Sequence, residues 1–249
     1  MQQRAGVRQQ AVLAPGAPAL AEPAAEAGIL AAGTRWATPY YVVDSLAEGP
    51  TLLLVAGVHG NELAGPLAAE RMRRWSIVRG RLVLVPRANQ PALARHTRCA
   101  PGTRFGDLNR NFPRAEADAP RGTMAQALWC AVMAAEPDCL VDLHEGFDFN
   151  RANDKSVGSS VLYIPKADNG DQAERLVRAV NATVGAPERY FTLLRWPARG
   201  SLSRAAWEQL GIPGLILETT RQKQALELRV AQHELMVAEL LSGLAMLER

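Results

Sequence analysis

The chain has 249 residues, of which 48% are hydrophobic, 21% charged and 6% aromatic, and its formal charge at pH 7 is +3. This length and composition are typical of a globular protein that buries its core within one domain. The charge is too small to argue for nucleic-acid binding, and no apolar stretch approaches the ~18 residues of a membrane span. Three cysteines without a C-x-x-C pair predict free thiols in a reducing compartment.

Residues 1–34 are rich in alanine, proline and glycine and show no sustained hydrophobic period. They are expected to form a poorly ordered leader or a hairpin at one edge of the fold. Arg4 and Arg8 precede an apolar stretch and resemble the start of a secretory signal, but two prolines interrupt that stretch. A cytoplasmic location is therefore predicted, and a periplasmic or secreted one would follow if the leader were a signal.

From residue 35 onward, apolar runs bounded by turn residues alternate with amphipathic segments. Strands are expected at residues 39–45, 51–57, 81–89, 139–146, 159–165, 189–196 and 214–220. Helices are expected at residues 63–75, 124–136, 171–184, 201–211 and 225–248. The alternation predicts a single three-layer α/β/α domain over residues 35–249, in which helices cover both faces of a mixed, mostly parallel sheet. No second domain is expected.

Four polar side chains follow or end three of the expected buried strands. His59 and Glu62 come after the run at 51–57, His144 ends the run CLVDL, and Glu218 ends the run GLIL. The carboxyl ends of parallel strands form the edge where ligand clefts open in such sheets. Burying a histidine or glutamate there without a partner costs several kcal/mol. The pattern therefore predicts one shared site.

Two ligands close in sequence and a third far downstream are a common arrangement for catalytic zinc. His59, Glu62 and His144 would bind one Zn²⁺ ion per chain and leave a coordination position open. Glu218 would take a proton from the attacking water and return it to the leaving group. Two other histidines, His96 and His233, are expected in a loop and on a helix surface, outside the site.

A long segment from residue 90 to 123 has few apolar residues and many Pro, Gly and Arg, and such loops are often functional. Within it, Asn109 and Arg110 can hold a substrate carboxylate, since guanidinium groups bind carboxylates in a bidentate manner. An arginine shortly before this pair, Arg104 or Arg98, could stabilise charge on the scissile carbonyl oxygen. Arg104 is the first choice.

Taken in order, the motifs HGNE, DLNRNFP, VDLHEG and ILETT resemble those of the succinylglutamate desuccinylase and aspartoacylase family within the zinc carboxypeptidase superfamily. The resemblance covers about residues 37–247 and implies a zinc carboxypeptidase-like fold. It implies that His59, Glu62 and His144 are the zinc ligands and that Glu218 is the catalytic glutamate. It also implies a substrate-carboxylate pair at Asn109 and Arg110, with a carbonyl-polarising arginine ahead of it.

Two features depart from the family's pattern. Aspartoacylases carry a C-terminal β domain over the site, whereas the sequence after Glu218 predicts one helix. The segment ETTRQ also lacks the glycine that often follows the catalytic glutamate in desuccinylases. Both departures concern substrate choice rather than the hydrolytic residues, so the pocket is expected to be more open or to be completed by another subunit.

The sequence therefore predicts a zinc-dependent hydrolase that cleaves an amide bond next to a free carboxylate, most simply in an N-acyl amino acid or a similar small amide. One alternative is a metallocarboxypeptidase acting on peptide or peptidoglycan fragments. Another is a non-catalytic member that binds a carboxylate ligand. The expected partner is a small-molecule substrate, with no nucleic acid and no membrane, and a homo-oligomer is left open.

Overall fold

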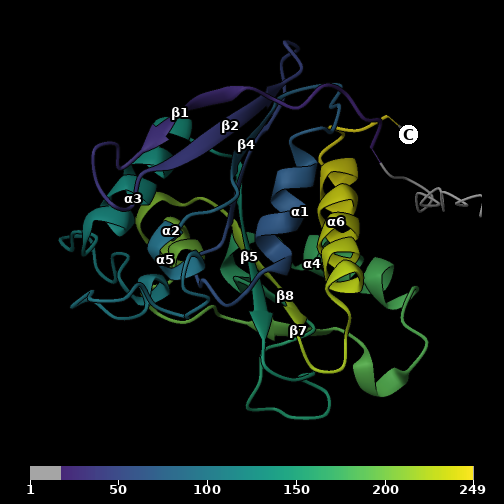
Figure 1. Cartoon of the computed structure of the whole chain (residues 1–249). Coiled ribbons are helices and arrows are strands. Elements are labelled where there is room, and N and C mark those ends of the chain that lie inside the picture. The colour runs from purple at the N-terminus through teal and green to yellow at the C-terminus, as the bar shows by residue number, and fades with distance from the viewer. Residues whose placement is uncertain (1–17, 249) are drawn as a thin grey trace, which may run out of the picture.

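The computed structural model describes residues 18–248, so residues 1–17, which make up half of the predicted leader, lie outside the described residues. Eight strands form one sheet in the order β1-β2-β4-β3-β5-β8-β6-β7 (Figure 1). Their bounds are β1 Glu26–Leu30, β2 Thr38–Asp44, β3 Thr51–Ala56, β4 Arg81–Val85, β5 Cys139–Gly146, β6 Ser160–Tyr163, β7 Thr192–Arg195 and β8 Gly214–Thr220. The central pairs β4–β3–β5–β8 are parallel, whereas β1–β2, β2–β4 and β6–β8 are antiparallel.

Helices cover both faces of this sheet (Figure 1). The helices on one face are α1 Ala64–Met72, α4 Gly170–Asn181 and α6 Leu226–Gly243, and those on the other are α3 Thr123–Ala135 and α5 Leu202–Leu210, with the short α2 Gln90–Leu93 nearby. The predicted three-layer α/β/α fold is thus confirmed. Strand β1, which belongs to the segment expected as a leader or an edge hairpin, pairs with β2 at the sheet edge.

The central strand β3 shows why its sequence is an unbroken apolar run. Leu52 and Leu54 pack into the core on the α1, α4 and α6 side. Leu53 and Val55 pack into the core on the α3 and α5 side. Because both faces of a parallel sheet are covered, side chains that point in opposite directions are all buried. The same double burial applies to β5 and β8, whose residues are all buried.

The helix α5 begins and ends where its sequence predicts. The Ser201 hydroxyl accepts a hydrogen bond from the backbone N–H of Arg204 at 3.4 Å, which satisfies one amide of the first turn. Gly211 follows the last turn with a φ of 70°, a left-handed conformation that glycine adopts without strain. These two residues set the ends of α5, and Ser201 itself lines the cleft described below.

The pairing of β5 with β8 brings together two of the predicted site residues. His144 lies directly opposite Glu218 in the parallel register of these strands. Both side chains therefore project from the same edge of the sheet, close to the turn after β3 that carries His59 and Glu62. Among residues 18–248, no helix is both long enough and apolar enough to cross a membrane.

His233 differs from its predicted position on a helix surface, because it is fully buried on α6. The helix packs against α1 and α4 and covers the sheet, so several of its sides are enclosed (Figure 1). The Nε2 atom of His233 lies 3.3 Å from the Thr219 hydroxyl. Burial and the nearby His144 lower the pKa of His233 to about 3. The imidazole is therefore neutral in the folded protein at physiological pH.

This buried imidazole should make stability depend on pH. The pKa of a histidine in the unfolded chain is about 6.5, so His233 becomes protonated below that pH when the chain is unfolded. In the folded protein the same side chain stays neutral down to about pH 3. Stability should therefore fall as pH falls through 6.5, by about 2 kcal/mol between pH 6.5 and 5. Urea unfolding of the wild type and of His233→Gln should show this loss only in the wild type. Parallel pH profiles for the two proteins would contradict it.

Candidate metal centre and substrate cleft

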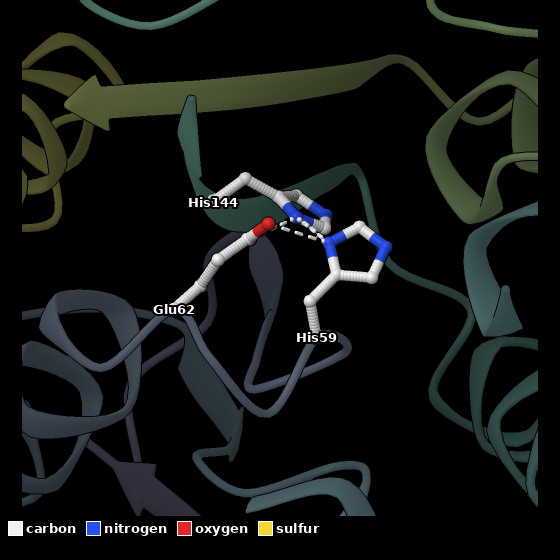
Figure 2. A group of neighbouring side chains, drawn as sticks. All are labelled: His59, Glu62 and His144. Atoms are coloured by element: carbon white, nitrogen blue, oxygen red, sulfur yellow. Dashed lines mark hydrogen bonds and ion pairs between the residues drawn. The ribbon is translucent and has the colours of Figure 1, made fainter. Parts of the chain in front are cut away.

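His59, Glu62 and His144 meet at the predicted sheet edge and point toward one another (Figure 2). Each offers one ligand atom, and these atoms all lie within 4.8 Å of one another. The Nδ1 atoms of the two histidines are 3.1 Å apart, and both lie 2.8 Å from Glu62 oxygens. All three residues are at least nine-tenths buried. Two imidazoles and one carboxylate, converging and buried, form a donor set that suits a divalent metal ion.

A carboxylate orients each imidazole from behind. His59 Nε2 lies 2.8 Å from Asp107 Oδ1, and His144 Nε2 lies 2.8 Å from Asp142 Oδ2. An Nε2–H that donates to a carboxylate leaves the Nδ1 lone pair free to bind a metal, and this arrangement is common at zinc sites. Asp142 lies two residues before His144 on β5, on the same side of the strand.

Asp107 is a site residue that the sequence analysis did not identify. It opens the motif DLNRNFP and precedes a single turn of 3-10 helix, Leu108–Arg110, whose Asn109 N–H it also binds at 2.9 Å. The sequence signal that could have identified Asp107 was its position two residues before the predicted carboxylate-binding pair Asn109 and Arg110. Although burial raises the pKa of Asp107, the hydrogen bond and ion pair with His59 and the charge of Arg98 lower it well below its usual range.

The pKa shifts of Glu62 and His144 suit a site in which a metal cation binds as a proton leaves. Burial raises the pKa of Glu62, but the charges and hydrogen bonds of His59 and His144 outweigh burial and hold the pKa low. Burial lowers the pKa of His144, but Asp142 and Glu62 raise it well above its usual value. These shifts favour an ionised Glu62 and a positive charge beside it, which either a proton on His144 or a bound metal ion would supply.

Glu218 lies beside this group on β8 with an unusual environment. It is buried, and its Oε2 atom has no hydrogen-bond partner among the described residues. Burial raises its pKa well above the usual range; His144 opposes that effect, and Glu62 acts with it. A carboxyl group that binds a proton this readily, at the wall of a cleft, has the properties of a general base that later acts as an acid.

The structure brings Arg98, rather than the predicted Arg104, to the ligands. Arg98 Nη1 lies 3.3 Å from Glu62 Oε1, and its Nη2 donates to Asp107 Oδ2 at 2.8 Å. The guanidinium of Arg104 lies 4.8 Å from the centroid of the Phe105 ring and lines a separate cavity. The turns between residues 98 and 107 therefore direct the two arginines to different sides of the loop. This placement favours Arg98 as the arginine that faces the reacting group.

Asn109 and Arg110 both line the cleft, but they have different freedom. The Asn109 Oδ1 atom accepts a hydrogen bond from the Leu202 N–H at 2.9 Å, and its Nδ2 lies 3.3 Å from Asp142 Oδ2. Arg110 donates to the carbonyl oxygen of Asn109 at 2.6 Å through Nη1. Its other guanidinium N–H groups have no protein acceptor among the described residues, so Arg110 is the member of the pair with donors left for a ligand.

One cleft of about 480 Å³, which we call the substrate cleft, is lined by the three candidate metal ligands, Glu218, Asn109 and Arg110. Its outer wall is partly apolar, because Phe147, Val157 and Trp196 line it while remaining 57%, 40% and 38% exposed. Lys155 and Arg195 also line it. A volume of this size accommodates a small metabolite rather than a water molecule alone.

Comparison with known proteins places these features in a family. Residues 48–244 match the model of the succinylglutamate desuccinylase/aspartoacylase catalytic domain. The chain is 32% identical over 151 residues to an N-α-acetyl-L-2,4-diaminobutyric acid deacetylase of Halomonas elongata, a match that covers 56% of this chain and 39% of the relative.

Solved structures with the same fold include the cell shape determinant protein Csd4 of Helicobacter pylori, with a TM-score of 0.68 and 20% identity over 83% of this chain and 55% of Csd4. An aspartoacylase family protein from Mesorhizobium loti has a TM-score of 0.62 and 24% identity over 89% of this chain and 66% of that protein. The chain thus spans well under two thirds of the length of the deacetylase and of Csd4. Since the family model covers most of the chain, the protein belongs to the succinylglutamate desuccinylase/aspartoacylase family.

Proposed function

We propose that this protein is a zinc-dependent hydrolase that removes the acyl group from an N-acyl amino acid. The observation that carries the proposal is the convergence of His59, Glu62 and His144 beside buried Glu218, whose Oε2 atom has no hydrogen-bond partner within residues 18–248. Family membership supports zinc as the metal, and two imidazoles with one carboxylate fit it. A bound zinc ion would supply Lewis acidity, which polarises an amide carbonyl and lowers the pKa of water.

The chain's own residues then have separate tasks in the reaction. Glu218 takes the proton of the attacking water and returns it to the nitrogen of the departing amine. Arg98, held by Asp107 at 2.8 Å, offers its remaining N–H groups to the negative charge that develops on the carbonyl oxygen. Arg110 binds the free carboxylate of the substrate, and Asn109 fixes the loop by its contact with Leu202.

The charges around the substrate cleft support an anionic substrate. Arg110, Lys155, Arg195 and Arg221 line it, and none forms an ion pair with an acid of the described residues. The related Halomonas elongata enzyme acts on an acetylated diamino acid, whose free amine would be repelled by these cations. We therefore propose an N-acyl derivative of an acidic amino acid, with one carboxylate on Arg110 and a second near the other cations.

A metallocarboxypeptidase is the second candidate function. Its support is the exposed apolar wall of Phe147, Val157 and Trp196, which could accommodate the rest of a peptide. Csd4 of Helicobacter pylori, which has the same fold, is described as a D,L-carboxypeptidase. The two reactions share the metal site and the base, and they differ in what occupies the outer part of the cleft.

A hydrolysis screen followed by mass spectrometry separates these candidates. Zinc-loaded protein would be incubated with N-acetyl-L-aspartate, N-acetyl-L-glutamate, N-α-acetyl-L-2,4-diaminobutyrate and a set of short peptides, with Glu218→Gln as the blank. We expect cleavage of the acidic N-acetyl amino acids at least about ten-fold faster than that of the diaminobutyrate derivative. Cleavage restricted to peptides would overturn the deacylase proposal in favour of a carboxypeptidase, and preference for the diaminobutyrate derivative would overturn the charge argument.

A further inference from the structure

Glu145, the residue after the candidate metal ligand His144 on β5, faces the opposite side of the sheet. Successive side chains of a strand alternate between its two faces. Leu143, two residues before Glu145, packs into the core on the α1, α4 and α6 side. The Glu145 side chain therefore points toward these helices, and it has no exposed surface. A carboxylate buried in this way is costly unless it is paired, so its partners show what holds it in place.

The Glu145 carboxylate connects two helices. Its Oε2 atom accepts a hydrogen bond from the backbone N–H of Ala64 at 3.0 Å, and its Oε1 atom forms an ion pair with Nη1 of Arg229 on α6. Ala64 is the first residue of α1, and Leu63 before it provides no side-chain cap. The Glu145 carboxylate therefore takes the place of a cap at a helix terminus that favours negative charge.

The backbone of the same residue contacts the candidate metal ligand Glu62. The Glu145 N–H donates to Glu62 Oε2 at 3.1 Å, and Glu62 lies two residues before α1 begins. A Cβ atom added at Gly65 would lie 2.9 Å from the Leu143 Cβ atom, so the start of α1 rests directly on β5. The Glu145 backbone thus holds the Glu62 carboxylate, and its side chain holds the helix that follows Glu62.

The fold does not need this buried pair merely to join α1 to α6. The two helices lie side by side (Figure 1), and the exposed pair Arg71–Glu227, at 2.7 Å, already connects them. A buried ion pair is also weak evidence for stability, since apolar side chains of similar size often stabilise a fold equally well. In addition, the Nε atom of Arg229 has no hydrogen-bond partner within residues 18–248. What the Glu145–Arg229 pair adds is a fixed position for the start of α1.

We propose that Glu145 and Arg229 are positioning residues of the metal centre, which set the place of Glu62 relative to His144. Arg229 holds the Glu145 carboxylate against the Ala64 amide, so the turn that carries Glu62 stays against β5. Neither residue belongs to the three converging ligands. Removing a group that orients metal ligands typically costs about 10- to 100-fold in metal affinity. The inference rests on the metal centre of the proposed function, but on no property of the hydrolysed substrate.

The test is the zinc affinity of full-length Arg229→Gln, measured by competition with a chromophoric chelator. We expect zinc to bind about 10- to 100-fold more weakly than to the wild type, because Glu145 would no longer hold the start of α1. A purely electrostatic role predicts the opposite sign, since the loss of a positive charge near the site favours a metal cation. Arg71→Gln, which breaks the exposed pair between the same helices, is the matched control and should stay within about three-fold of the wild type.

An apolar double variant separates positioning from stability. Glu145→Met/Arg229→Met removes both charges and leaves none unpaired, so urea unfolding of the metal-free protein should find it at least as stable as Arg229→Gln. Its zinc affinity should nevertheless remain about ten-fold or more below that of the wild type. The visible absorption spectrum of cobalt(II), bound in place of zinc, depends on ligand geometry and should differ from that of the wild type in both variants.

Unchanged or tighter zinc binding in Arg229→Gln would overturn the positioning role. Wild-type zinc affinity and cobalt spectrum in the double methionine variant would also overturn it, because the pair would then only avoid an unpaired buried charge. A wild type without zinc affinity would overturn the metal centre and this inference together. A wild type that binds zinc but cleaves no N-acyl amino acid would refute only the proposed reaction, since none of these measurements depends on hydrolysis.

Discussion

Glu218→Gln should retain its metal and lose turnover by about 10²- to 10⁴-fold, the range typical for removal of a general base. The amide has almost the same shape as the carboxyl group, but it cannot accept a proton from water and return it to the amine. Because Glu218 is not one of the three converging ligands, metal content should be unchanged. Metal analysis and steady-state kinetics on the same preparation test both parts.

A matched control for this variant is Glu174→Gln, the same change at an exposed position on α4 away from the substrate cleft. It should behave as the wild type in both measurements. Full activity in Glu218→Gln would exclude this residue as the base. Loss of the metal together with activity would instead assign Glu218 to the ligand set.

Arg98→Gln should lower kcat by about 10²- to 10³-fold, the effect of removing one donor to a developing oxyanion. Arg104→Gln makes the same change to an arginine six residues later in the same loop, and it should stay within about three-fold of the wild type. The reason is placement: Arg98 reaches Glu62 and Asp107, whereas Arg104 lies over the Phe105 ring. Kinetics of both variants at equal metal content provide the comparison.

The reverse ranking of these two variants would restore the choice that sequence spacing alone suggested. Equal, small effects would show that neither guanidinium stabilises the transition state. Because Arg98 also contacts Asp107, metal content must be measured in Arg98→Gln. A loss of metal would mean that the arginine acts by holding Asp107 rather than by contacting the carbonyl.

The convergence of the candidate metal ligands was predictable because strand ends constrain side chains strongly. The apolar runs of β5 and β8 end near the carboxyl ends of two parallel neighbouring strands, so His144 and Glu218, each two residues before the end of its strand, were expected close to one edge of the sheet. The register of β5 and β8 determines the position of one residue relative to the other along the strands, and it places His144 directly opposite Glu218. His59 and Glu62 are three residues apart in the turn that follows β3, so both side chains were also expected close to this edge of the sheet.

The loop from residue 90 to 123 was less predictable because no sheet or long helix fixes its path. Which arginine faces the metal ligands depends on individual turns, such as the positive φ of 68° at Gly102 and of 63° at Gly106. The role of Asp107 likewise depends on its contacts with His59, which lies 48 positions earlier in the chain, and with Arg98, which lies 9 positions earlier. His233 was misplaced for a related reason, because the sequence of α6 does not reveal how many of its sides are covered.

The positions of the three ligands have a consequence for the protein's resistance to denaturation. His59 and Glu62 follow β3, and His144 lies on the adjacent β5, so a bound cation would join two neighbouring strands at their carboxyl ends. No short fragment of the chain contains all three ligands, and an unfolded chain would bind the ion much more weakly. A free metal concentration 100-fold above Kd would therefore stabilise the native state by about 2.7 kcal/mol. The melting temperature of this protein would then report metal supply as well as packing.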